Sequence, residues 1–147
     1  MEGLRFRPAL PDERLELEEL QRRASLALEE YREQLEANPD AIELPAEQIE
    51  HGQVIVAELD DRVAGFAVVL AEGGKAELDG LFVEPELWRR GVGAALVEAA
   101  THEARGKGLS LLTVVANPSA KEFYERCGFA AEGETETRFG PALKMSR

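Results

Sequence analysis

The sequence predicts a mixed α/β (α+β) fold, in which a mostly antiparallel central sheet is flanked by helices. Strand-like runs over 54–59 and 63–70, which are rich in β-branched residues, and an apolar run over 76–83 are separated by short polar turns, which is typical of an antiparallel meander. A helix-period segment over 92–104 then leads to another apolar run over 109–116. Because a helix crosses between them, we expect the strands 76–83 and 109–116 to be parallel.

The first third of the chain is predicted to be mainly helical. Residues 4–7 alternate as a short strand, and Asp12 can cap the helix that follows. Apolar residues recur at three- and four-residue steps, which predicts an amphipathic helix to about Ala37. They are Leu17, Leu20, Ala24, Ala27 or Leu28, Tyr31 and Leu35. The periodicity shows no break, although Ser25 is a candidate cap for a second helix. A helix of one or two turns is expected over 45–51.

The later elements follow from turn residues. Gly106-Lys107-Gly108 should end the helix over 92–104, whose inner face is expected to hold Val92, Leu96, Ala99 and Ala100. Pro118 can start a last helix and Gly128 can end it. Residues 129–132 and 142–146 are expected to close the sheet as a hairpin.

Composition limits the class of protein. A chain of 147 residues with 44% apolar content fits a single domain over 1–147. We expect a cytoplasmic protein, because neither a signal peptide nor a membrane span is visible and one cysteine excludes an internal disulfide. Two histidines and no cysteine cluster argue against a metal site. The net charge of −12 argues against binding to nucleic acid.

The acidic residues are unevenly distributed. Residues 1–50 contain fourteen Asp and Glu against six Arg, a net charge of −8. One interpretation is a solvated helical face that keeps the protein soluble. The other is a negative field that attracts a cationic amine, with Glu29, Glu30 and Glu33 as candidate residues of a groove.

The loop between the run 76–83 and the following helix has the composition of an anion site. Glu84-Pro85 ends the strand, and Gly91 and Gly93 allow the backbone to approach an anion closely. The helix start adds free N–H groups and its positive dipole end. Spacing excludes a dinucleotide fingerprint, whose third glycine would fall at Leu96, and a P-loop.

A second motif follows one strand later and makes the pair specific. The loop Trp88-Arg89-Arg90-Gly91-Val92-Gly93 resembles the Gln/Arg-x-x-Gly-x-Gly/Ala signature of the Gcn5-related N-acetyltransferase (GNAT) family. Asn117, Tyr124 and Gly128-Phe129 resemble that family's Asn-(x)-Tyr-(x)-Gly-Phe helix. The resemblance is strongest over residues 54–129. Trp88 departs from the pattern, since the family usually has Gln or Arg there.

The resemblance implies acetyl-CoA as co-substrate and a GNAT-like fold whose parallel strand pair splays to form the CoA cleft. Backbone N–H groups of the loop would hold the pyrophosphate, and they belong to Arg89, Arg90, Gly91, Val92, Gly93 and Ala94. The pantetheine arm would pair with the strand 76–83 through Leu81, Phe82 and Val83. Asn117 would meet the pantetheine amide, and it can also act as a helix cap.

The resemblance also implies catalytic roles. The Leu81 N–H would stabilise the oxyanion, and Tyr124 would protonate the leaving thiolate, unless it is a ring packed beside Phe123. Glu77 is the candidate base; it is otherwise an exposed charge, with the proton relayed through water. By alternation Glu77, Asp79 and Leu81 should share one strand face. Gly80 fits either a bulge that opens the cleft or a close backbone approach.

The sequence therefore predicts an N-acetyltransferase that moves an acetyl group from acetyl-CoA to a primary amine by direct attack in a ternary complex. A small cationic amine is the favoured acceptor. The alternatives are an acetylase of protein lysines or N-termini, and a CoA-binding module without transfer activity. No membrane partner is expected, and the sequence leaves open whether the chain forms a homodimer.

Overall fold

In the part of the chain that the structure describes, the strands form one seven-stranded sheet. The computed structural model describes residues 3–147, apart from the side chains of Glu29 and Glu30. The strand order is β1-β2-β3-β4-β5-β7-β6, and within the described residues every neighbouring pair is antiparallel except β4 and β5. The strands are β1 Leu4–Pro8, β2 Val54–Leu59, β3 Arg62–Glu72, β4 Lys75–Val83, β5 Leu112–Ala116, β6 Ala130–Thr137 and β7 Gly140–Ser146. The predicted fold class is confirmed.

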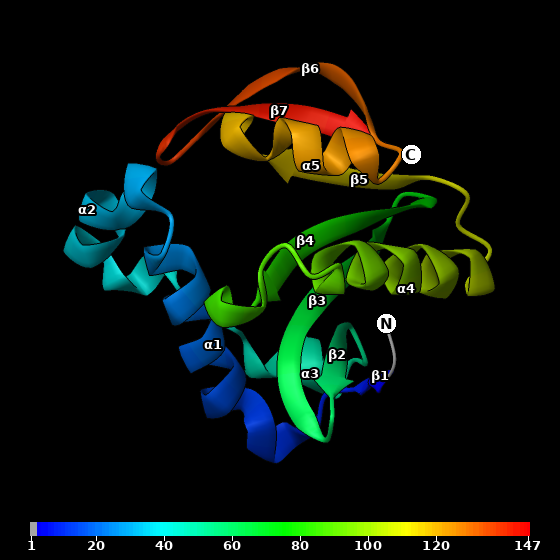
Figure 1. The fold of residues 1–147 in the computed structure, drawn as a ribbon. Helices are drawn as coiled ribbons and strands as arrows, with labels where there is room; N and C mark the ends of the chain where they lie inside the picture. The colour runs from blue at the N-terminus through cyan, green and yellow to red at the C-terminus, as the bar shows by residue number, and fades with distance from the viewer. Residues whose placement is uncertain (1–2) are drawn as a thin grey trace.

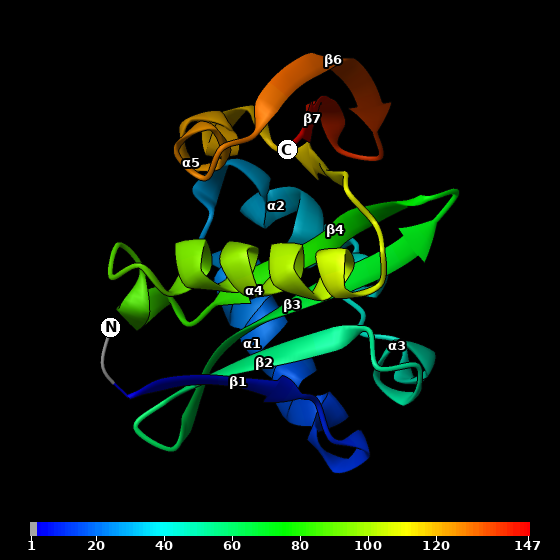
Figure 2. The same cartoon turned by 90° about the vertical axis from the view of Figure 1, so that its right-hand side faces the viewer.

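Helices cover both faces of the sheet (Figures 1 and 2). They are α1 Arg14–Leu26, α2 Glu29–Ala37, α3 Ala46–Glu50, α4 Val92–Gly106 and α5 Lys121–Arg126, with short 3-10 turns at η1 Pro11–Glu13, η2 Pro39–Ala41, η3 Pro85–Leu87 and η4 Pro118–Ala120. Residues of α4 and α5 share one hydrophobic cluster with β4 and β5, while α1 and α3 pack on a second cluster built on β2 and β3. No helix in the described part of the chain is long and apolar enough to cross a membrane.

The helical first third differs from the prediction at its caps and at its break. Asp12 lies in the turn η1 and does not cap α1; instead the Glu13 carboxylate accepts the Leu10 N–H at 2.8 Å. The predicted helix is divided, because Leu28 adopts an extended backbone (φ −86°, ψ 103°) and starts α2. Ser25 therefore lies inside α1 and caps nothing. No glycine or proline marks this break, which is why the periodicity did not reveal it.

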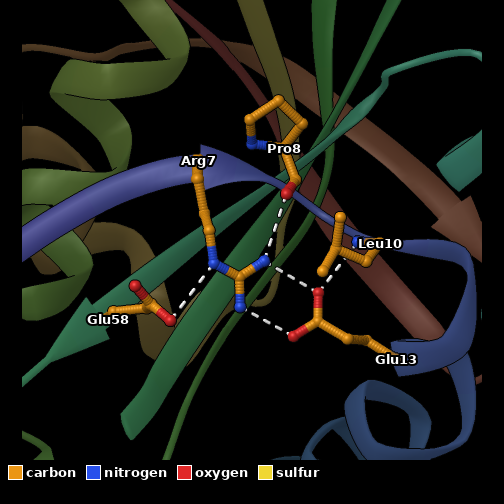
Figure 3. A network of polar contacts seen from close by, with 5 residues as sticks. All are labelled: Arg7, Pro8, Leu10, Glu13 and Glu58. Atoms are coloured by element: carbon orange, nitrogen blue, oxygen red, sulfur yellow. Dashed lines mark hydrogen bonds and ion pairs between the residues drawn. The ribbon is translucent and has the colours of Figure 1, made fainter. Parts of the chain in front are cut away.

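A polar network fixes the start of the chain against the sheet (Figure 3). The Arg7 guanidinium donates two hydrogen bonds to the Glu13 carboxylate, at 2.8 and 2.7 Å, and its Nε lies 3.2 Å from a Glu58 oxygen. The arginine lowers the pKa of Glu13 below its usual range. The network joins β1, η1 and β2, and so sets the position from which α1 crosses the sheet.

Candidate active site

The parallel strands β4 and β5 separate at one end. Their pairing covers Ala76–Leu112, Glu77–Thr113 and Leu78–Val114 and goes no further, although β4 continues to Val83 and β5 to Ala116. The unpaired halves form the splayed cleft that the sequence predicted. A pocket of about 850 Å³ opens here.

This pocket collects segments that are distant in the sequence. Most of the predicted cofactor residues line it, namely Leu81, Phe82, Val83, Arg89, Gly91, Gly93, Ala94, Asn117 and Tyr124. Arg90 and Val92 do not line it, and the Val92 side chain is buried in the core under α4. For both residues the predicted contact with the pyrophosphate is made by the backbone N–H, which the lining side chains do not test. The cofactor-binding roles of Arg90 and Val92 therefore stay predictions.

The loop before α4 has the backbone geometry of an anion-binding nest. Arg89 and Gly91 have positive φ angles of 66° and 89°, whereas Arg90 between them does not. Such alternation turns successive N–H groups toward one point, and the start of α4 at Val92 adds its dipole. Positive φ is strained for arginine, so the surrounding loop must hold it there.

Trp88, the departure from the family pattern, fastens this loop to the sheet. Its indole Nε1–H donates to the Val83 carbonyl at 2.8 Å, and its side chain also lines the pocket. A side chain at Gly93 would begin 3.2 Å from the Phe123 ring, so α4 and α5 pack closely at this glycine.

Tyr124 packs against neighbouring aromatic rings and also lines the pocket. Its ring meets Phe123 and Phe129 edge to face, with centroids 5.0 and 5.3 Å away. Its hydroxyl makes no hydrogen bond to another described residue, and no buried side-chain N or O atom in the described part lacks a partner, so the hydroxyl keeps contact with solvent. Burial raises the pKa of Tyr124 to about 12.

Asn117 precedes η4 but makes no side-chain capping hydrogen bond. The capping role suggested by the sequence is therefore wrong, and its amide stays available in the pocket that it lines. Asn117 and Tyr124 thus supply two polar groups without a partner among the described residues.

A bulge in β4 changes which residues share a face. Val69 pairs with Leu78 and Val68 with Gly80, so Asp79 is an extra residue. Leu81 consequently packs in the same cluster as Leu78. The expectation that Glu77, Asp79 and Leu81 share one face is wrong, because strict alternation fails at the bulge.

Glu77 lies beside the main pocket, not in it. It lines a neighbouring recess of about 500 Å³ with Glu72, Thr113, Glu132 and other residues, and the two hollows share Val114 and Val115. Burial, followed by the nearby Asp79 and Glu72 charges, raises the pKa of Glu77. Asp79, by contrast, is exposed and lines the main pocket.

The acidic groove suggested for the first third does not form at Glu33. That residue is exposed and does not line the pocket, whereas Leu28, Tyr31 and Leu35 do. Helical spacing turns the apolar residues of α2 inward and the glutamate outward. The side chains of Glu29 and Glu30 lie outside the described ones.

Comparisons with known proteins identify the family. A model of the Acetyltransferase (GNAT) family matches residues 16–129. The chain belongs to this family. An uncharacterized N-acetyltransferase of Escherichia coli K12, YafP, is 39% identical over 83 residues, or 56% of this GNAT chain and 49% of the relative. The match therefore spans about half the length of that relative.

Solved structures share the fold over nearly the whole GNAT chain. The PaiA N-acetyltransferase of Thermoplasma acidophilum, crystallised with coenzyme A, superimposes with a TM-score of 0.80 at 21% identity, and the match covers 98% of each chain. A GCN5-related N-acetyltransferase from Rhodopseudomonas palustris gives 0.79 at 25% identity, covering 100% of this chain and 96% of the other. At such identities the PaiA likeness concerns the fold alone.

Sequence reasoning missed the far wall of the pocket in this GNAT chain. Thr137 and Phe139, at the turn between β6 and β7, line the pocket together with Arg126. The predicted hairpin strands, 129–132 and 142–146, left the turn undefined. No local pattern shows that this turn contacts Asn38 and Asp40, which follow α2 about a hundred residues earlier.

Proposed function

We propose that this chain transfers an acetyl group from acetyl-CoA to a primary amine by direct attack in a ternary complex. The observation that carries the proposal is one continuous pocket joining three features. These are the anion nest at residues 89–94, the splay between β4 and β5, and the unpartnered side chains of Asn117 and Tyr124. A thioester molecule that carries a pyrophosphate at its far end fits the order in which these three features follow one another along the pocket.

In this proposal each part of the cofactor has a partner. The pyrophosphate lies on the N–H groups of the nest, with the Arg89 and Arg90 charges beside it. The pantetheine arm adds to the unpaired edge of β4 near Leu81 and Val83 and meets the Asn117 amide. The Trp88 indole already donates to the Val83 carbonyl, so a pantetheine N–H that bonded there would share this acceptor with Trp88.

The chemistry requires the amine nitrogen to attack the thioester carbonyl carbon. A C–N bond forms, the C–S bond breaks, and the amine loses a proton while the thiolate gains one. The Leu81 N–H is proposed to stabilise the developing oxyanion. No covalent enzyme intermediate is needed, and burial raises the pKa of the Cys127 thiol, which disfavours a thiolate nucleophile.

Tyr124 is the proposed acid for the departing thiolate. With a pKa of about 12 its phenol stays protonated at neutral pH, as an acid must. The same shift makes it a weaker acid than free tyrosine, so its contribution should lie low in the usual range.

Glu77 is the proposed base, and its raised pKa favours proton acceptance. Because it lines the adjoining recess, the proton would reach it through water.

The decisive experiment separates binding from transfer. Acetyl-CoA at about a hundred times its Kd should stabilise the fold by about 2.7 kcal/mol, which corresponds to a Tm increase of about 5–10 °C for a chain of this size. Release of CoA thiol with an amine, and the acetylated amine in a mass spectrum, would demonstrate transfer. Stabilisation without any acetylated product would instead favour a CoA-binding module.

A further inference from the structure

The pocket ends in an apolar wall built by two elements that are remote in sequence. One side is the face of α2 formed by Leu28, Tyr31 and Leu35, which lie three and four residues apart. The other side is Phe139, at the tip of the β6–β7 hairpin, and Val115 of β5, which is 47% exposed, also lines the pocket. Val115 is exposed although it belongs to a sheet strand, because its side chain borders the pocket.

A polar clasp, formed by Arg138, joins the hairpin tip to the segment that directly follows α2. Arg138 forms an ion pair with Asp40 at 3.2 Å and donates a hydrogen bond to the Asn38 side chain at 3.0 Å. Its guanidinium also lies 5.3 Å from the centre of the Phe139 ring. Figure 1 shows α2 and the hairpin tip on the same side of the molecule. The wall is therefore a formed feature, joined across about a hundred residues of sequence.

The pocket has few charged lining residues, and the negative and positive ones lie in different places. Asp79 is the one carboxylate among the described lining residues, and it lies at the β4 bulge, two positions before Leu81. Arg89 and Arg126 are the cations of the lining. A single positive group near the splay, attached to an apolar body toward α2, complements this arrangement, whereas a second positive group would meet no further carboxylate among the described lining residues.

We infer that the acceptor is a monoamine with an apolar, ring-sized body, whose nitrogen lies near Asp79 and whose body contacts Leu28, Tyr31, Leu35, Phe139 and Val115. The inference rests on the proposed function and replaces the polycationic acceptor that the acidic first third suggested. Apolar contact should determine which amines are preferred as acceptors, because each buried methylene of the acceptor changes kcat/KM by about tenfold or more.

The test compares three amines at saturating acetyl-CoA: 2-phenylethylamine, 1,4-diaminobutane and a short lysine-bearing peptide. The kcat/KM for 2-phenylethylamine should exceed the other two by at least about tenfold. Leu35→Glu should remove most of this advantage and leave the KM for acetyl-CoA unchanged. Gln34→Glu, which adds the same carboxylate to an exposed position of the same helix, is the matched control and should change neither value.

Calorimetry provides a readout that does not need catalysis. Titrated into the protein saturated with CoA, 2-phenylethylamine should bind at least about tenfold more tightly than 1,4-diaminobutane. That preference without any transfer would refute the proposed function and the acceptor role of the amine, while the selectivity of the pocket for an apolar monoamine would stand. A preferred diamine or peptide, no binding of the aryl amine, or equal effects of Leu35→Glu and Gln34→Glu would overturn the inference.

Discussion

Replacing Gly91 by aspartate tests whether the loop before α4 binds a pyrophosphate. Gly91 has a φ of 89°, and a side chain added there would meet no atom within 4 Å. Asp and Asn both tolerate positive φ better than other residues, so Gly91→Asn is a nearly isosteric control that carries the same backbone strain. The difference between the two variants isolates one negative charge.

The magnitude follows from the exposure of the loop. Two unit charges 4 Å apart interact with about 1 kcal/mol in bulk water and about 4 kcal/mol at the effective dielectric typical of a protein surface. Against a doubly charged pyrophosphate in an exposed loop, we expect a penalty of about 2–4 kcal/mol, or about 30- to 1000-fold in the Kd for CoA. Gly93 is a poorer position, because a side chain there would also press on the Phe123 ring.

Titration calorimetry with CoA measures the effect directly. The Asp-to-Asn ratio of Kd should shrink as salt is raised from about 0.01 to 1 M, since the Debye length falls from about 30 to 3 Å. Pantetheine, which lacks the pyrophosphate, should bind both variants equally. A Kd for CoA that differs by less than about threefold between the variants would refute the placement of the pyrophosphate.

Three further predictions concern the acid, the fold and the clasp. Tyr124→Phe should lower kcat by about a hundredfold, the low end for a general acid, with the Kd for acetyl-CoA little changed; unchanged turnover in a rate-limiting chemical step would make Tyr124 a packing residue only. Glu13→Gln should lower the free energy of unfolding by about 1–3 kcal/mol at pH 7. Because Arg7 depresses the pKa of Glu13, this difference should be complete above about pH 4.3 and vanish as pH falls through the folded-state pKa; a pH-independent difference in urea melts would contradict it. Arg138→Asp should raise the acceptor KM by about threefold without changing the KM for acetyl-CoA, and adding Asp40→Arg should restore it if the ion pair itself holds the wall.

The parts of the site that the sequence predicted are those made by consecutive residues. The loop around Gly91 combines a strand end, two glycines and a helix start, and these act within a few residues of one another. The helix that crosses between β4 and β5 predicted that they are parallel, whereas their splay was expected from the family resemblance. The far wall could not be predicted, because Phe139 and Leu35 come to line one pocket only through the tertiary arrangement of a hairpin turn and a helix. The division of the first helix at Leu28 was missed for a similar reason, since the residues around it favour a helix locally.

The bulge at Asp79 accounts for the outcome of two sequence-based expectations, one about Gly80 and one about the face that Glu77 shares with Leu81. Gly80 was expected to mark either a bulge or a close approach, and the structure has both. The extra residue lies directly before Gly80, and a side chain on Gly80 would begin 2.8 Å from the Phe82 ring, which packs 5.2 Å from Phe66. The bulge also comes directly after Leu78, the last residue of β4 that pairs with β5. One inserted residue thus coincides with the opening of the cleft, separates the face of Glu77 from that of Leu81, and leaves Asp79 in the pocket. A pattern of strict alternation has no means of showing such an insertion, so the expectation that Glu77 and Leu81 share a face is wrong. The base role of Glu77 came from the family resemblance and stays a proposal.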